Sequence, residues 1–89
     1  MSWAYRIEES AVRDLRNLGP SAAAEIREYL NMRVEGCENP TSFGKPLRGS
    51  KHGLWRYRVR DWRVVCKLDE HMSMVVVVAV GHRSLVYGD

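Results

Sequence analysis

Two runs of alternating residues, 55–60 and 62–68, constrain the fold of this 89-residue chain more strongly than any other feature. Successive side chains of a β-strand point to opposite faces of the sheet. As strands, both runs have one apolar face and one face that carries cations. The apolar positions are Trp55, Tyr57, Val59, Trp62, Val64, Cys66 and Leu68, and the cationic positions are Arg56, Arg58, Arg60, Arg63 and Lys67. The two runs therefore predict a β-hairpin with one face in the core.

Burial of the apolar face determines the register of this hairpin. A turn centred on residues 60–61, whether two or four residues long, places Arg58 opposite Arg63 and gathers the apolar side chains on one side. A three-residue turn would place Val59 opposite Arg63 and would mix the two faces. We expect the four-residue turn, because the pair Arg-Asp is not favoured in two-residue turns.

The predicted register brings like charges together. Two like charges opposite each other on neighbouring strands destabilise the sheet by about 0.2–1 kcal/mol. A purely structural hairpin would more easily carry Thr, Ser or Glu at one of these positions. Arg56, Arg58 and Arg63 therefore indicate a site for an anion, and the planar guanidinium group suits phosphate, which it contacts through two N–H groups at once. The alternative is a solvated charged face without a ligand.

The first half of the chain predicts a strand and two helices. Residues 3–7 alternate between apolar and small or polar side chains, as in a strand. Apolar residues then recur at helical spacing in two stretches, 11–18 and 26–34, with Gly19 between them and Gly36 after them. The short break indicates an antiparallel helical hairpin.

The second half predicts mainly strands. Residues 37–53 are rich in Gly and Pro and predict a loop with one short strand near residues 45–47. Residues 72–80 predict a last strand, whose valines indicate a central position covered on both faces. We therefore expect one α+β domain, residues 1–89, of order β-α-α-β-β-β, with two N-terminal helices packed on one face of an antiparallel sheet.

Composition excludes several classes of protein. Two cysteines are too few for a disulfide scaffold, and the three histidines show no metal-binding spacing, so we expect no metal and no cofactor. Residues 1–44 carry five basic and seven acidic side chains, whereas residues 45–89 carry nine and four, a split that favours a polyanionic partner for the second half. Without a signal peptide or a run long enough to cross a bilayer, we expect a cytoplasmic protein and no membrane partner.

The end of the chain adds the most specific pattern. The last strand runs into Gly81-His82-Arg83, and Val86-Tyr87 follows shortly afterwards. Together with Pro46-Leu47-Arg48-Gly49 and the arginine hairpin, in this order, these segments resemble the RelE family of bacterial toxins, in the RelE/ParE superfamily. The resemblance covers nearly the whole chain. It implies the small RelE-like fold of toxins that an antitoxin neutralises.

The resemblance also implies roles for five residues. Members of the family cleave mRNA in the ribosomal A site without a metal, by attack of the 2′-hydroxyl on the phosphodiester. Arg56 and Arg58 match a basic pair that supports the reacting phosphate, and Arg63 matches an arginine that stabilises it. Arg83 matches a residue proposed as the general acid. Tyr87 matches a residue proposed as the general base, whose phenolate form nearby cations would favour.

Further polar residues complete the expected RNA-binding surface. We expect contacts with mRNA or ribosomal RNA from Lys45, Arg48, Lys51, Arg60, Lys67 and His82. Arg60, at the turn, is expected to contact the backbone rather than to act in catalysis. The implied partners are a RelB-like antitoxin, the 30S A site of the ribosome and mRNA. Operator DNA is expected only indirectly, through the antitoxin complex.

Two other functions stay open at this point. A ParE-like toxin shares the fold but inhibits DNA gyrase, and it has no need of the arginine set with Tyr87. A non-catalytic protein that binds the antitoxin and helps it repress an operator would tolerate loss of Arg83 and Tyr87. The set of five residues favours a metal-independent endoribonuclease over both.

Overall fold

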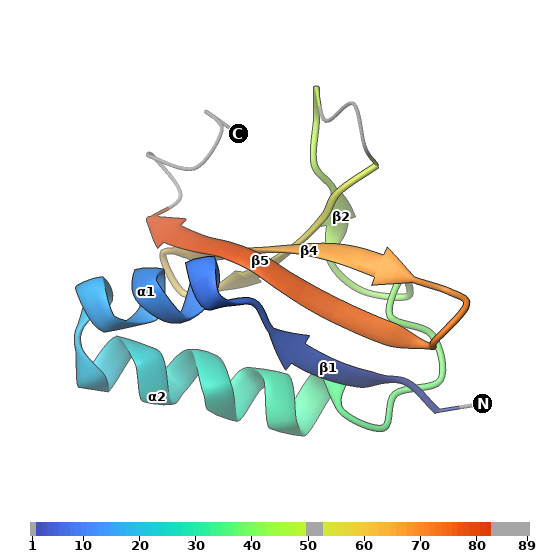
Figure 1. Cartoon of the computed structure of the whole chain (residues 1–89), viewed down its shortest axis with the longest axis horizontal. Helices are drawn as coiled ribbons and strands as arrows, with labels where there is room; N and C mark the ends of the chain where they lie inside the picture. Colours follow the sequence, from blue (N-terminus) through green and yellow to red (C-terminus); the bar gives the residue numbers. More distant parts are fainter. Residues whose placement is uncertain (1, 50–52, 83–89) are drawn as a thin grey trace.

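Five strands form one sheet, and two helices cover one of its faces (Figure 1). The computed structural model describes residues 2–49 and 53–82. The strands are β1 (Ala4–Ile7), β2 (Lys45–Pro46), β3 (Trp55–Val59), β4 (Trp62–Asp69) and β5 (Met74–His82). The helices are α1 (Glu9–Leu18) and α2 (Pro20–Tyr29), which continues as the wider turn η1 (Leu30–Val34). The expected α+β class and order of elements are confirmed, with β2 as the short additional strand.

The sheet is mixed, and the expectation of a wholly antiparallel sheet is wrong for β1. The strand order is β1-β5-β4-β3-β2, and β1 pairs with β5 in parallel, with Tyr5 opposite Val75. The other three pairings are antiparallel. Two helices and three strands separate β1 from β5 in the chain, so β5 can return in the direction of β1. Alternating residues carry no information about strand direction, because both kinds of ladder have the same side-chain period.

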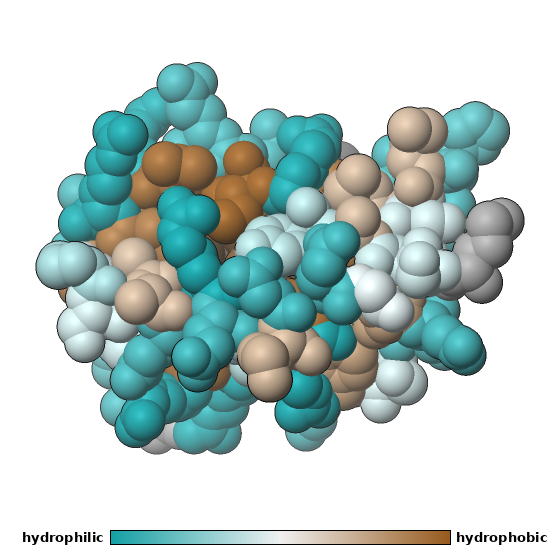
Figure 2. Space-filling model, turned by 90° about the horizontal axis from the view of Figure 1, so that it is seen from below, coloured by the Kyte–Doolittle hydropathy of each residue, from teal (hydrophilic) through white to brown (hydrophobic). Residues whose placement is uncertain are grey.

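The helices turn their apolar sides toward the sheet. Ala11 and Leu15 of α1 and Ile26 of α2 are almost completely buried, and the helical spacing continues through Leu30 and Val34 of η1. Viewed from below, the molecule shows mostly hydrophilic side chains, with a group of apolar ones toward the side where α1 joins α2 (Figure 2). No helix in residues 2–49 and 53–82 is long and apolar enough to cross a membrane.

A β-bulge in β5 keeps the valines of this strand in the core. The pairing of β4 with β5 skips Val78, so Val77 before the bulge and Val80 after it both face the helices. Side chains of α1 bond the backbone at the bulge. Ser10 Oγ donates to the carbonyl oxygen of Val78 at 2.8 Å, and the N–H of Val80 donates to Asp14 Oδ2 at 2.9 Å. Helix α1 thus holds the part of β5 that extends beyond β1.

The hairpin of β3 and β4 has the register that burial predicts. Arg58 lies opposite Arg63. The turn is shorter than we expected, because the strands leave only Arg60 and Asp61 between them. Arg60 has a φ of 53°, in the left-handed region, and its Nε lies 2.8 Å from Glu25 Oε2 on α2. This ion pair helps to hold a residue type that two-residue turns seldom use.

Candidate functional site

A groove of about 600 Å³ opens at the edge of the sheet, beside β3. Its walls come from α2 and η1, the loop before β2, and the β3–β4 hairpin. The lining residues are Tyr29, Arg33, Phe43, Gly44, Lys45, Arg56, Arg58 and Arg63. Five of them are cationic and none is acidic. A concave site with one sign of charge attracts anions, and its guanidinium groups suit phosphate.

The three arginines that were expected to bind phosphate line this groove together. Arg56 is half-buried, Arg58 is exposed and Arg63 is only 7% exposed. Arg58 Nε donates to the carbonyl oxygen of Arg60 at 3.2 Å, which restricts the guanidinium group of Arg58. Burial of a charged side chain such as Arg63 is unusual, because the guanidinium loses hydration. A phosphate in the groove would bring an opposite charge close to this buried cation.

The loop 40–44 forms one wall of the groove because a glycine lets it lie against β3. Gly44 has a φ of +73°, and a Cβ at this position would lie 2.5 Å from the carbonyl oxygen of Arg56. Any other residue would therefore push the loop away from the strand. Tyr57, in the core, holds the same loop, since its hydroxyl donates to the carbonyl oxygen of Pro40 at 2.7 Å. The shape of this wall thus depends on packing beneath it.

The other residues expected to bind RNA lie in several places. Lys45 lines the groove. Arg48 is exposed in the loop after β2, Lys67 is exposed on β4, and His82 is exposed at the end of β5. The remaining predicted site residues lie outside the described residues, namely Lys51, Arg83 and Tyr87. Their roles stay predictions.

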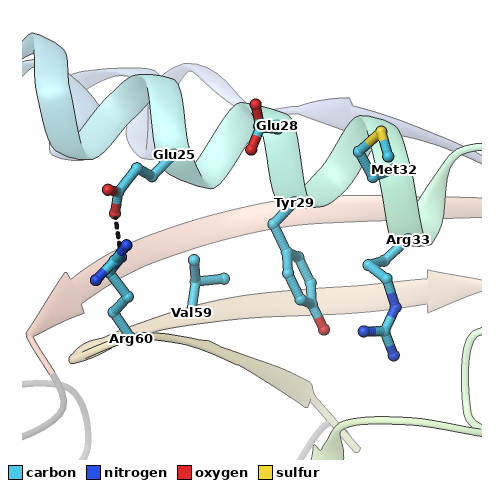
Figure 3. A pocket seen from close by; sticks show the side chains of 7 residues that line it. All are labelled: Glu25, Glu28, Tyr29, Met32, Arg33, Val59 and Arg60. Atoms are coloured by element: carbon cyan, nitrogen blue, oxygen red, sulfur yellow. Dashed lines mark ion pairs between the residues drawn. The ribbon is translucent and has the colours of Figure 1, made fainter.

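Arg60 lies apart from the three arginines of the groove. Figure 3 shows it in a second, smaller groove of about 300 Å³, where it points toward Glu25 of α2. This groove is lined by Glu25, Glu28, Tyr29, Met32, Arg33, Val59 and Arg60. Two acids balance its two arginines, so it suits a polyanion less well than the larger groove.

Four residues of the larger groove were not predicted from the sequence: Tyr29, Arg33, Phe43 and Gly44. Tyr29 and Arg33 are four residues apart, a spacing that indicates a shared helix face, but nothing in the sequence shows that this face meets β3. Burial raises the pKa of the Tyr29 phenol, and the charge of Arg33 opposes this with a smaller effect. Tyr29 is therefore a neutral aromatic wall of the groove at physiological pH.

Comparison with known families places this fold and its cationic groove in a class of small toxins. The family model of the ParE toxin of type II toxin-antitoxin systems, parDE, matches residues 5–87. The chain belongs to this family, and the resemblance to the RelE/ParE superfamily is confirmed.

Individual relatives agree with this assignment. The chain is 30% identical to toxin RelG of Mycobacterium tuberculosis over 87 residues, which cover 98% of both chains. It is 35% identical to toxin RelE of the same organism over 81 residues, or 91% of this chain and 81% of RelE. The solved toxin-antitoxin complex RelBE2 from M. tuberculosis contains a chain that is 29% identical to this one, with a TM-score of 0.80. The match covers 93% of this chain and 100% of the RelBE2 chain. The isolated E. coli RelE toxin, with 24% identity and a TM-score of 0.67 over 97% and 92% of the chains, shares the fold.

Proposed function

We propose that this toxin is a ribosome-dependent mRNA endoribonuclease that a RelB-like antitoxin neutralises. The observation that carries the proposal is the groove in which Arg56, Arg58 and Arg63 meet Lys45, with no acidic side chain among the described residues that line it. An RNA backbone is the anion that such a groove fits, and the relatives named RelE and the RelBE complexes support this reading.

The arginines match the charge that develops in the reaction. Attack of the 2′-hydroxyl oxygen on phosphorus forms a phosphorane, whose non-bridging oxygens carry two negative charges. The bond to the 5′ oxygen then breaks, which leaves a 2′,3′-cyclic phosphate and a 5′-hydroxyl. Guanidinium groups that strands hold in place stabilise this state without reorganising. Arg63, in its buried position, would act most strongly because little water screens it.

In the proposed mechanism, the residues that transfer protons follow β5 in the sequence. Gly81 lies opposite Arg63, so β5 ends beside the arginines shortly before Arg83. By the family resemblance, Tyr87 removes the proton of the 2′-hydroxyl, and Arg83 supports the departing 5′ oxygen. An arginine rarely gives up a proton, so Arg83 would act mainly through its charge, and the departing 5′ oxygen would take its proton from water.

The ribosome would supply what the groove lacks. The eight groove residues include cations and aromatic rings but no carboxylate or imidazole that could serve as a strong general base. Holding the mRNA in the A site would orient the 2′-hydroxyl for attack, and orientation alone can lower a barrier substantially. The toxin would then act in the cytoplasm, where translation takes place.

Inhibition of DNA gyrase is the second candidate, because the matching family model is that of the ParE toxin. A gyrase inhibitor needs a binding surface rather than convergent arginines, so the groove favours RNA cleavage. A catalytically inactive protein that binds an antitoxin and acts as a co-repressor is a third reading. Both alternatives predict that the protein does not cleave ribosome-bound mRNA, whereas the proposed function predicts that it does.

Primer extension on mRNA bound to purified ribosomes tests the proposal. The wild type should cut within the A-site codon. Arg58→Ala should lower the cleavage rate by about 100-fold or more, the usual effect of removing one group that stabilises transition-state charge. Because Arg58 is exposed, its loss should leave the fold intact. Arg16→Ala, an exposed change on α1, is the matched control and should cut at the wild-type rate.

Two results would contradict the proposal. The first is an Arg58→Ala variant that cuts as fast as the wild type. The second is a wild type that leaves ribosome-bound mRNA intact but inhibits DNA supercoiling by purified gyrase. Inactivity in both assays would support the co-repressor reading.

A further inference from the structure

Arg33 lies on an aromatic support at the wall of the larger groove. Its guanidinium carbon is 5.2 Å from the ring centroid of Phe43 and 5.8 Å from that of Tyr29. Tyr57 lies behind both rings, with centroids 5.0 Å from Phe43 and 6.1 Å from Tyr29. Figure 3 shows Tyr29 and Arg33 leaving α2 and η1 on the same side, toward the strands. Rings from three segments, namely α2, β3 and the loop before β2, therefore hold the cation that η1 carries.

The two rings hold the guanidinium of Arg33 at the groove, while the side chain stays exposed. A planar guanidinium that contacts aromatic rings on one side can still stack on a flat ligand with its free face. A simple point charge for phosphate would need no such support, and lysine serves that role elsewhere. The arrangement therefore favours a flat ligand group over a second phosphate.

The position of Arg33 relates this platform to the phosphate site. Arg33 and Phe43 line the same groove as Arg56, Arg58 and Arg63. Single-stranded RNA offers a flat base within one nucleotide of every phosphate, and proteins bind such bases by stacking them on aromatic rings or guanidinium planes. We propose that Arg33, backed by Tyr29 and Phe43, stacks the base of the nucleotide next to the reacting phosphate. This inference rests on the proposed function, since it assumes that the groove binds RNA.

The test measures binding of a fluorescein-labelled single-stranded RNA hexanucleotide to the purified toxin by fluorescence anisotropy. Arg33→Lys keeps the charge but removes the plane. It should weaken binding by roughly 5- to 150-fold, the range for loss of one stacked base. Its salt dependence should stay that of the wild type, because no phosphate contact is lost. Arg27→Ala, an exposed change on α2 outside the groove, should bind as the wild type does.

An RNA without bases provides the second arm of the test. The wild type should bind an abasic hexanucleotide about as weakly as Arg33→Lys binds the normal one, and Arg33→Lys should lose little more on the abasic RNA. Unchanged affinity in Arg33→Lys would overturn the inference. A second variant, Arg33→Ala, would also overturn it if the salt dependence of its binding became weaker while its affinity for normal and abasic RNA fell equally. That result would indicate a phosphate contact. Failure of the wild type to bind either RNA at low salt would overturn it as well.

The ribosome assay separates this inference from the proposed function. A wild type that binds RNA through Arg33 but leaves ribosome-bound mRNA intact would contradict the cleavage proposal alone. A wild type that cuts mRNA, together with an Arg33→Lys variant that binds the hexanucleotide normally, would contradict the stacking proposal alone. Equal thermal unfolding of Arg33→Lys and the wild type would establish that the substitution acts on binding and not on the fold.

Discussion

The two faces of the β3–β4 hairpin consist of the same strands but differ in what they contribute. On the side of the helices, Tyr57 and Val64 are completely buried in the core. On the other side, exposed Arg58 lies opposite Arg63, an arrangement that destabilises the sheet. Alternation thus lets one hairpin stabilise the fold with every second residue and present cations with the others. Substitutions on the first face should change stability, and those on the second should change function.

The separation between the faces is incomplete close to β5. Val65 and Val76 lie on the side of the arginines and are almost completely buried, as is Arg63. Of the three groove arginines predicted from the sequence, only Arg58, on β3, is exposed. Substitutions of Arg63 would therefore mix effects on folding and function, whereas Arg58 reports on the cationic face alone.

The largest expected effect is a loss of stability on the helix side. Leu15→Ala removes a side chain that is 1% exposed, and it should lower the free energy of unfolding by about 2–5 kcal/mol. Urea denaturation followed by circular dichroism measures this change. Met32→Ala, at a residue that is 77% exposed, should stay within about 0.5 kcal/mol of the wild type. If folded Leu15→Ala, assayed at low temperature, cleaves RNA far more slowly than the wild type, the proposed division between the faces is wrong.

An intermediate effect is expected where the core supports the groove. Tyr57→Phe keeps the ring but leaves the buried carbonyl of Pro40 without its donor at 2.7 Å, which should cost about 1–3 kcal/mol of stability. Hydrogen exchange should also become faster in the loop 40–44. Tyr5→Phe is the matched control, because it removes an equally short hydrogen bond to Asn31, at 2.7 Å, but an exposed one. Equal losses in the two variants would show that the loop does not depend on Tyr57.

Much of the hairpin could be predicted because burial and alternation act locally. The opposition of Arg58 and Arg63 follows from the need to bury Tyr57 and its neighbours on one side, and the structure has that register. The helices could be predicted from apolar spacing in the same way. The two-residue turn could not be predicted. The left-handed φ of Arg60 there is accompanied by an ion pair with Glu25, which lies thirty-five residues earlier in the chain.

The rest of the groove could not be predicted, because it depends on contacts between distant elements. Arg33 lies over the Phe43 ring in the groove because η1 continues α2 beyond Tyr29, and Phe43 lies there because Gly44 allows its loop to approach β3 closely. The parallel pairing of β1 with β5 was missed for a similar reason, since the direction of a strand is set by the whole path of the chain. Local patterns predicted the residues of the hairpin, whereas tertiary packing determines what surrounds them.

The smallest expected effect is a gain in stability on the cationic face. Arg58→Thr removes one of two like charges that lie directly opposite each other, and it should raise the free energy of unfolding by about 0.2–1 kcal/mol. The gain should shrink as salt is added, because salt screens exposed charges. Arg58→Lys keeps the repulsion and should show no gain in the same urea denaturation series. A loss of stability in Arg58→Thr would mean that Arg58 stabilises the fold. That result would contradict the view that the cationic face lowers stability in exchange for function.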